Sequence, residues 1–593
     1  MKGFGRPGGQ GGNIFAVLFR ARGDLVVHIR DVACIGDLRI QDAQQPHEDI
    51  RAHHGAQIAQ MGAVIDGGTT EIDPDVLRIE WCELSLFARV GVVQTEHVRD
   101  GIGHRGDQCA SRRFGATGFV TLVRMIWPAI GRLMRSTFKD PTSPRGHALA
   151  LLRVALPLAL SQLSEMSMGV TDTILLGGLG VAEVAVGGLA NTFFFTTMVT
   201  CQTILGGAGV LLSHGRGAED HGREAHDGRS VMSATFLLAL LIFVPCALLL
   251  WNVQPLFAWL SEPSDVVTQG SHFIRILLYS LLPDLAVIGV LRVALPSLGA
   301  ETLLLWIMPA MAICNGITNA ALIHGWFGLP AMGLFGSATA TTLTGWAISV
   351  ALTGLCLMHP RVRAVMKPAA VHWPVMKELL KLGLPMMLGA AAEILMFQIT
   401  SLRAGELGTQ SLAAHQVAVN VSALLFMVCL AIGQSTNVRV AYWRGAGRMD
   451  QSRRAAWTGI WIVLVWSVLS SALLLIWPEK IVSLYFTGHA PDPATAALVI
   501  TLMKIAGIYQ IVDVLQVVFS GALRGCGDTV WPMVIAVSNY GLIGLVFGGW
   551  LAFQQHWGAE GLWIGMATAL TVSSVALGFR LFSVMRRAEP VPS

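Results

Sequence analysis

Residues 383–447 decide the fold, and they read GLPMMLGAAAEILMFQITSLRAGELGTQSLAAHQVAVNVSALLFMVCLAIGQSTNVRVAYWRGAG. The stretch contains two apolar segments of membrane-spanning length, joined by a short turn from Gly405 to Thr409. A helix needs about 20 predominantly apolar residues to cross a bilayer. Glu393 lies inside the first segment. Because an ionisable side chain within a spanning helix is costly, Glu393 is a candidate functional residue that requires a partner nearby.

The composition of the whole chain indicates an all-α polytopic membrane protein. Hydrophobic residues make up 53% and charged residues 13% of its 593 residues, whereas soluble domains carry about 25% charged residues. The nine cysteines are scattered without a CxxC pair, which supports neither a disulfide framework nor a zinc site. We expect twelve spanning helices, with approximate cores at 150–174, 187–212, 231–251, 270–294, 303–323, 335–357, 378–402, 411–436, 456–477, 496–520, 531–552 and 561–583.

Residues 1–145 differ from everything that follows them. They begin rich in glycine and then carry dense charge and histidine, without a membrane-length segment. His47, His53 and His54 do not indicate a metal site, because no second ligand cluster accompanies them. We therefore expect either a disordered tract or an N-terminal extension in front of the native start, with Met134 as the candidate start.

The predicted loops differ sharply in their content of basic residues. One set carries most of them, namely Arg216, Arg223 and Arg229; Arg361, Arg363, Lys367, Lys377 and Lys381; and Arg444, Arg448, Arg453 and Arg454. The alternate loops at 177–186, 325–334 and 553–560 contain no Lys or Arg. Because cytoplasmic loops carry an excess of Lys and Arg, we expect the basic loops and both termini to face the cytoplasm.

An internal repeat divides the membrane region in two. LLRVALP at 151–157 recurs as LLKLGLP at 379–385, and this pair defines the offset of the repeat. The same offset relates Gly180 to Gly408, Arg216-Gly217-Ala218 to Arg444-Gly445-Ala446, Ala294-Leu295 to Ala522-Leu523, and Gly299 to Gly527. We therefore expect two homologous six-helix lobes, at 148–366 and 376–587. Because six is even, both lobes enter the membrane from the same side, as in the parallel repeats of some transporters, with a cleft between them near the midplane.

Five carboxylates lie at membrane depth, namely Glu165, Asp172, Asp284, Glu393 and Asp513. The repeat relates Glu165 to Glu393 at the same offset, and it relates Asp284 to Asp513 at an offset longer by a single position. A buried carboxyl group without a cation favours its protonated form, so it can bind and release H⁺, or bind Na⁺ through its oxygens. These are the properties of a site for a coupling ion.

The alternative is that each acid neutralises a buried basic residue, such as Arg275, Arg292 or Lys504. These three lie nearer the predicted helix ends, where long basic side chains can snorkel to the membrane interface. Their placement favours the ion site over simple charge neutralisation.

Neutral polar residues accompany the acids at helical spacing. Three pairs lie at i and i+4, namely Tyr509 with Asp513, Asn315 with Asn319, and Gln416 with Asn420. Residues four apart share one face of a helix, so each pair can present its oxygens together. A buried amide in a membrane helix can equally form an interhelical hydrogen bond, and that alternative stays open.

Two prolines occupy equivalent positions in the first helix of each predicted lobe, Pro157 and Pro385. A proline inside a helix removes one backbone hydrogen bond and permits bending. Each is therefore a candidate hinge, with packing at a helix start as the alternative.

Three motifs resemble the multidrug and toxic compound extrusion (MATE) family, in its NorM-like branch. They are LPLALSQLSEMSMGVTDTILLGGLG at 156–180, AAHQVAVN at 413–420 and VDVLQVVFSGALRGCGDT at 512–529. The resemblance covers about 148–587 and implies a MATE/MOP-like fold that exports cationic amphipathic drugs or toxins in antiport with Na⁺ or H⁺. It also implies a monomer in a bacterial inner membrane, with no cofactor besides the coupling ion and no nucleic-acid partner.

The family's functional residues match positions of this chain one by one. Its helix 1, helix 7 and helix 10 acids match Asp172, Glu393 and Asp513, its helix 10 tyrosine matches Tyr509, and its helix 5 asparagine pair matches Asn315 and Asn319. Glu165 and Asp284 depart from the family pattern. Ion stoichiometry and substrate charge therefore do not follow from the resemblance.

Two functions other than efflux, a lipid flippase and an intramembrane protease, have sequence requirements of their own. A lipid-linked oligosaccharide flippase of the same superfamily would need a basic cavity to hold pyrophosphate, whereas the membrane-depth residues here are acidic. Gly525-Cys526-Gly527-Asp528 spells the GxGD motif of intramembrane aspartyl proteases, but the Tyr-Asp pair that such an enzyme needs does not occur. HExxH and GxxxxGK motifs are also absent from the sequence, so we do not expect an enzyme.

Overall fold

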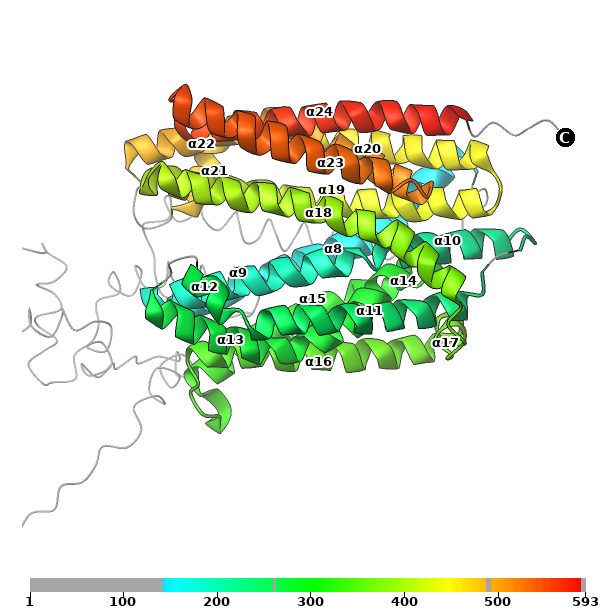
Figure 1. Ribbon diagram of the computed structural model, residues 1–593, viewed down its shortest axis with the longest axis horizontal. Coiled ribbons are helices and arrows are strands. Elements are labelled where there is room, and N and C mark those ends of the chain that lie inside the picture. The colour runs from blue at the N-terminus through cyan, green and yellow to red at the C-terminus, as the bar shows by residue number, and fades with distance from the viewer. Residues whose placement is uncertain (1–141, 225, 260–262, 487–491, 588–593) are drawn as a thin grey trace, which may run out of the picture. The chain divides into compact units, whose positions relative to one another are not determined.

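The computed structural model describes residues 142–224, 226–259, 263–486 and 492–587 (Figure 1). The predictions for His47, His53, His54 and Met134 lie outside these residues. Within them, twelve helices are long and apolar enough to cross a membrane. Each predicted core falls on one of these helices, so the all-α, twelve-helix fold is confirmed.

The first six spanning helices form the N-lobe. They are α8 (Pro144–Gly177), α9 (Val181–Thr203) continued by α10 (Gly206–Glu219), α11 (Gly228–Trp251), α13 (Ser264–Pro283) continued by the π-helix η1 (Asp284–Gly289) and α14 (Val290–Leu298), α15 (Thr302–His324) and α16 (Leu334–Met358). Three short helices lie between or after them, namely α12 (Gln254–Trp259), η2 (Trp326–Gly328) and α17 (Pro360–Val365).

The C-lobe repeats this order. Its helices are α18 (Trp373–Glu406), α19 (Thr409–Gly445), α20 (Met449–Ile476), the short α21 (Pro478–Tyr485), α22 (Pro493–Gly525), α23 (Val530–Asn539) continued by the π-helices η3 (Tyr540–Phe547) and η4 (Trp550–Gln554), and α24 (Gly558–Arg587). Figure 1 shows α11, α13 and α16 on one side and α18 to α24 on the other. The helices α8 and α10 pack against α19 across the boundary.

Local signals in the sequence fix several helix ends. Ser143 caps α8 by accepting a hydrogen bond from a backbone N–H, and Pro144 takes the first helical position, where its missing N–H costs nothing. Asp227 caps α11 in the same way. Gly299 and Gly325 end α14 and α15 in the left-handed conformation, each with φ of 73°, which glycine adopts without steric penalty.

The two offsets of the sequence repeat have a structural cause. The longer offset, which relates Asp284 to Asp513, already relates the start of α13 at Ser264 to the start of α22 at Pro493. The shorter offset returns at Ala294. The N-lobe therefore contains a single extra residue between Asp284 and Ala294, and η1 lies there while α22 is α-helical throughout. A π turn holds one residue more than an α turn, so η1 absorbs the insertion.

The lobes meet most closely where α10 crosses α19. A Cβ atom added to Gly217 would lie 1.9 Å from the carbonyl oxygen of Tyr442, and one added to Gly445 would lie 2.0 Å from that of His214. The repeat relates the two contacts to each other, because its offset leads from Gly217 to Gly445 and from His214 to Tyr442. The α10 and α19 backbones can approach this closely only because Gly217 and Gly445 have no side chain.

The helix α18 connects the lobes and is bent, with its beginning reaching toward α17 (Figure 1). Pro385 lies within α18, and Pro157 lies at the equivalent position within α8. Close to Pro385, a Cβ atom on Gly383 would lie 2.0 Å from the carbonyl oxygen of Ile204, at the break between α9 and α10. The predicted hinge role of the two prolines stays a prediction.

Candidate functional site

A carboxylate of the N-lobe is enclosed by polar side chains of two other helices. Asp172 of α8 is 1% exposed. The amide of Asn319 on α15 donates a hydrogen bond to its Oδ1, and the hydroxyl of Thr341 on α16 is a second hydrogen-bond partner. One turn earlier on α15, Asn315 donates to Thr344 Oγ1 at 3.4 Å. The structure thus brings together three of the residues that the sequence singled out, Asp172, Asn315 and Asn319.

Each of the two asparagines has a side-chain oxygen atom that forms no hydrogen bond among the described residues. Both side chains are fully buried. Each uses its NH₂ group as a donor, while the Oδ1 atoms of Asn315 and Asn319 are buried without a hydrogen-bond partner. A buried carbonyl oxygen without a hydrogen-bond partner in the protein is free to accept a hydrogen bond from water or to coordinate an ion. Hard cations take carboxylate and amide oxygens as ligands. The donor set of Asp172 and the two asparagines therefore fits a small cation.

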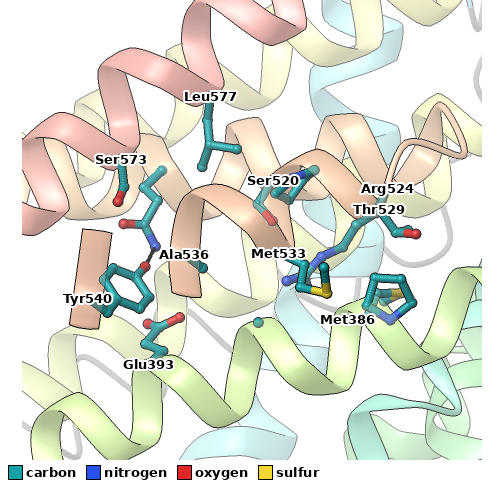
Figure 2. A pocket seen from close by; sticks show the side chains of 14 residues that line it. Met386, Glu393, Ser520, Arg524, Thr529, Met533, Ala536, Tyr540, Ser573 and Leu577 are labelled. Atoms are coloured by element: carbon teal, nitrogen blue, oxygen red, sulfur yellow. Dashed lines mark hydrogen bonds between the residues drawn. The ribbon is translucent and has the colours of Figure 1, made fainter. Parts of the chain in front are cut away.

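The C-lobe contains a small cavity beside Glu393. Its volume is about 30 Å³, and the polar residues that line it include Glu393 of α18, Gln516, Ser520 and Arg524 of α22, and Tyr540 of η3. About 10–15 Å³ suffices for one water molecule, so this cavity has room for a water molecule or a small cation. Figure 2 shows Glu393 pointing from α18 toward Tyr540, with Arg524 farther along on the side of Met386 and Met533.

Asp513 and Tyr509 lie on the same helix, one turn apart, as predicted. Asp513 is 6% exposed and Tyr509 is 3% exposed. The carboxyl group of Asp513 is close enough to that of Glu393 for their charges to repel each other. Two acids that repel each other at close range stabilise any cation that binds between them.

Six polar residues of this cavity were missing from the predicted site, namely Gln516, Ser520, Arg524, Thr529, Tyr540 and Ser573. Gln516 donates a hydrogen bond to the Tyr540 hydroxyl, and its Oε1 is buried without a partner. Gln516 and Arg524 both belong to the quoted motif at 512–529. Their helical spacing from Asp513 was the signal that could have placed them near it.

Gln416 and Asn420 do not join the carboxylates. Both side chains are exposed, and Asn420 donates to the hydroxyl of Tyr485 at 3.1 Å. Their neighbour His415 points into the C-lobe instead, where its Nδ1 accepts a hydrogen bond from Trp563 Nε1 at 3.0 Å. Because the indole nitrogen can only donate, His415 Nε2 carries the ring proton and faces the Ser401 hydroxyl at 2.8 Å.

Glu165 has an ionic partner, as the alternative interpretation of the acids allowed. Arg292 of α14 lies 2.6 Å from it, between Nη1 and Oε2, and also donates to the side-chain oxygen of Gln162. The expectation that Arg292 snorkels to the interface is therefore wrong, because its side chain is only 13% exposed. Asp284 lies at the start of η1, with the Ser280 hydroxyl as a hydrogen-bond partner.

Comparisons with known proteins agree with this architecture. The MatE family model matches residues 157–322 and 385–550, two ranges that the offset of the repeat relates to each other. The multidrug resistance protein NorM of Burkholderia vietnamiensis is 40% identical over 447 residues, which cover 75% of this chain and 96% of that protein. The crystal structure of the eukaryotic MATE transporter AtDTX14 has a TM-score of 0.67 at 19% identity, and covers 75% of this chain and 98% of that chain.

A second solved structure gives the same result. It is an outward-facing multidrug resistance MATE family transporter of the MOP superfamily, with a TM-score of 0.67 at 17% identity, and it covers 78% of this chain and 98% of that chain. The family model matches more than half of the chain and finds both lobes. The chain therefore belongs to the MatE family, and it shares its fold with the solved MATE transporters.

Proposed function

We propose that this protein is a secondary active multidrug efflux transporter that exports cationic amphipathic compounds in antiport with Na⁺ or H⁺. The observation that carries the proposal is a mid-helix carboxylate in each lobe: the buried Asp172 in one, and in the other the buried Asp513 with Glu393, which is partly buried beside a small cavity. None of the three takes part in an ion pair of the described residues. Acids that are not held in an ion pair can take up a proton or a sodium ion.

The position of Glu393 suggests how ion uptake is coupled to movement. Glu393 lies on α18, which connects the lobes and carries Pro385. Neutralising Glu393 and Asp513 removes their mutual repulsion and allows α18 and α22 to approach each other. Each ligand shifts the equilibrium between inward-open and outward-open states only through its different affinity for the two. Ion and drug therefore exchange when each favours a different state.

The proposal also includes the membrane, the orientation and the oligomeric state of the protein. The basic loops face the cytoplasm of a bacterial inner membrane, both termini lie on that side, and the protein works as a monomer. The positive-inside distribution of Lys and Arg supports this orientation. Alkaline phosphatase fused after Arg587 should be inactive in intact cells, since this reporter requires export; an active fusion would contradict the orientation.

The runner-up is the lipid-linked oligosaccharide flippase. Such a protein would use arginines to hold a pyrophosphate group. Arg292 is already paired with Glu165, the single arginine among the described residues that line the cavity beside Glu393 is Arg524, and the hydrogen-bond partners of Asp172 are neutral. Acidic surroundings favour cationic cargo by charge complementarity. The names of the relatives as multidrug resistance proteins agree with the efflux proposal.

The proposal is tested by transport in proteoliposomes loaded with a fluorescent lipophilic cation. Na⁺ and H⁺ gradients are imposed separately on the wild type and on the double variant Glu393→Gln, Asp513→Asn. The matched control is Glu479→Gln, Asp265→Asn, which removes two acids from exposed positions and thus changes the net charge equally. Asp172→Asn, measured alone, tests the N-lobe site.

Gradient-driven movement of the dye that is lost in the double variant and kept in the control supports an antiporter and identifies its ion. Movement that survives the double variant would assign the C-lobe carboxylates a structural role. If the wild type moves no cation under either gradient, while it translocates a fluorescent lipid-linked oligosaccharide, the flippase is the better description.

A further inference from the structure

The N-lobe contains a second pair of acids at the positions of the C-lobe pair. Glu165 of α8 repeats Glu393 of α18, and Asp284 repeats Asp513. The charges of Glu165 and Asp284 interact with each other, as those of Glu393 and Asp513 do. Each pair therefore has one acid on the first spanning helix of its lobe and one on the fourth.

The N-lobe pair differs from its counterpart by one basic residue. Arg292 places Nη1 2.6 Å from Glu165 Oε2, and its Nη2 donates to the side-chain oxygen of Gln162. The Arg292 side chain is 13% exposed and that of Glu165 is 26% exposed. A short, charge-assisted contact that is largely shielded from water is among the stronger polar contacts in proteins. Glu165 is thus neutralised by a cation that belongs to the chain.

The C-lobe has a serine and open space where the N-lobe has Arg292. The shorter offset of the repeat, which holds again beyond η1, relates Arg292 to Ser520. Ser520 lines the cavity of about 30 Å³ beside Glu393. Arg524 lines the same cavity and matches Pro296 in the repeat. Its charge interacts with that of Glu393, but the two form no ion pair among the described residues. The position of Arg292 in one lobe is therefore taken in the other by Ser520 beside a cavity, and the guanidinium group of Arg524 reaches that cavity from the next turn of α22.

We propose that Glu165 marks a second monovalent-cation site, in which Arg292 takes the place at Glu165 that a free Na⁺ or H⁺ takes at Glu393. The proposal rests on the proposed function in assigning Glu393 and Asp513 to the coupling ion. In the wild type, Glu165 therefore binds neither a proton nor a sodium ion from solution, because Arg292 stays paired with it. Removing the guanidinium group should release Glu165 to bind a proton or a sodium ion from solution.

The test uses dicyclohexylcarbodiimide, a hydrophobic reagent that modifies protonated carboxyl groups within membranes. The full-length protein is reconstituted in lipid nanodiscs, treated with the reagent, digested, and analysed by mass spectrometry of the peptides that contain Glu165 and Glu393. Arg292→Met removes the charge and keeps much of the side-chain volume. Arg292→Gln does the same while it retains hydrogen-bonding groups, which gives a second variant if the first does not fold. Arg292→Lys keeps the charge and is the matched control.

We expect Glu165 to be at least tenfold less modified than Glu393 in the wild type and in Arg292→Lys. In Arg292→Met and Arg292→Gln its modification should rise at least tenfold. Suppression of that modification by Na⁺ would identify sodium as a ligand, and suppression only by raised pH would identify the proton. The proposal is overturned if Glu165 is modified as fast as Glu393 in the wild type, or if neither charge-removing variant increases its modification.

These outcomes are separate from those of the proposed function. The comparison of Glu165 between the wild type and Arg292→Met needs no result at Glu393. Conversely, an unreactive Glu393 together with transport that survives Glu393→Gln would refute the coupling role of the C-lobe pair, whatever happens at Glu165.

Discussion

Alanine at Gly445 is expected to push the two lobes apart where α10 crosses α19. A Cβ atom there would lie 2.0 Å from the carbonyl oxygen of His214 and 2.7 Å from its carbonyl carbon. The repeat-related Gly217 makes the same contact with Tyr442. Because the atoms in the way belong to the backbone, no change of side-chain rotamer can relieve the clash.

The size of the effect follows from these distances. Ordinary van der Waals contacts of a Cβ atom begin at 3.4 Å, so the α10 and α19 backbones must separate by about 1.4 Å at this point. Overpacking of a tight contact typically costs about 1–3 kcal/mol. This cost falls only on conformations in which the lobes touch here. The equilibrium should therefore shift about 5- to 150-fold toward conformations in which this end is open.

Cys526 is a natural reporter of this opening. It is 7% exposed and follows Gly525, whose carbonyl oxygen accepts a hydrogen bond from His214 Nε2 at 3.1 Å across the lobe boundary. We expect Gly445→Ala to accelerate the modification of Cys526 by a membrane-impermeant maleimide about 5- to 150-fold, measured on its peptide by mass spectrometry. The buried Cys356 of the N-lobe core is the internal reference.

The matched control is Gly354→Ala, in α16, where an added Cβ atom would meet nothing within 4 Å. It should leave Cys526 as slow to react as in the wild type. In the double variant of Gly217 and Gly445, both methyl groups separate the same two helices, so the combined effect should be smaller than the product of the single effects. If folded Gly445→Ala protein labels Cys526 at the wild-type rate, the close contact does not hold the lobes together.

Three further predictions concern single contacts. Asn319→Ala removes the amide donor from the buried carboxyl of Asp172, and should lower the free energy of unfolding by about 1–3 kcal/mol; an unchanged thermal midpoint in detergent would contradict the contact. His415→Phe leaves the indole N–H of Trp563 buried without its acceptor, with a cost of similar size that tryptophan fluorescence during unfolding would show. Asp227→Ala removes the cap of α11 and should cost about 0.5–1 kcal/mol at neutral pH. The pKa of Asp227 is lowered by its hydrogen bonds to the Arg229 side chain and backbone, so this contribution is present at neutral pH and disappears as the pH falls through the lowered pKa. Unfolding of the wild type and the variant should then coincide in acid.

The sequence predicted the helices and the two-lobed fold because both follow from local patterns. A spanning helix must be apolar over a fixed length, and a duplicated lobe keeps its spacing wherever the chain tolerates no insertion. The pair of Asn315 and Asn319 was predictable for a similar reason, since residues four apart share a helix face. The contact of Asn319 with Asp172 joins α15 to α8, and no spacing within either helix predicts it.

Such local patterns do not predict contacts between helices that are far apart in the sequence. Glu165 and Arg292 are 127 residues apart, and nothing in either local sequence selects one as the partner of the other. The side of α19 that points into the lobe was not predictable for a different physical reason. A helix that is apolar on all sides has no polar face to mark its outside, so the sequence does not show which side of α19 points into the lobe.

The extra residue in η1 explains how the two lobes can differ in one side-chain contact while they share the same arrangement of helices. In an unbroken α-helix, one extra residue rotates everything beyond it by about 100°. Asp284, whose carboxylate lies beside Gly345 of α16, and Arg292, which is paired with Glu165 of α8, could not then both keep these contacts. The π turn takes up the extra residue, so Asp284 keeps the place of Asp513 and Arg292 keeps the place of Ser520. At that equivalent place the lobes then differ in one side chain, a hydroxyl beside a cavity in the C-lobe and a guanidinium group paired with Glu165 in the N-lobe.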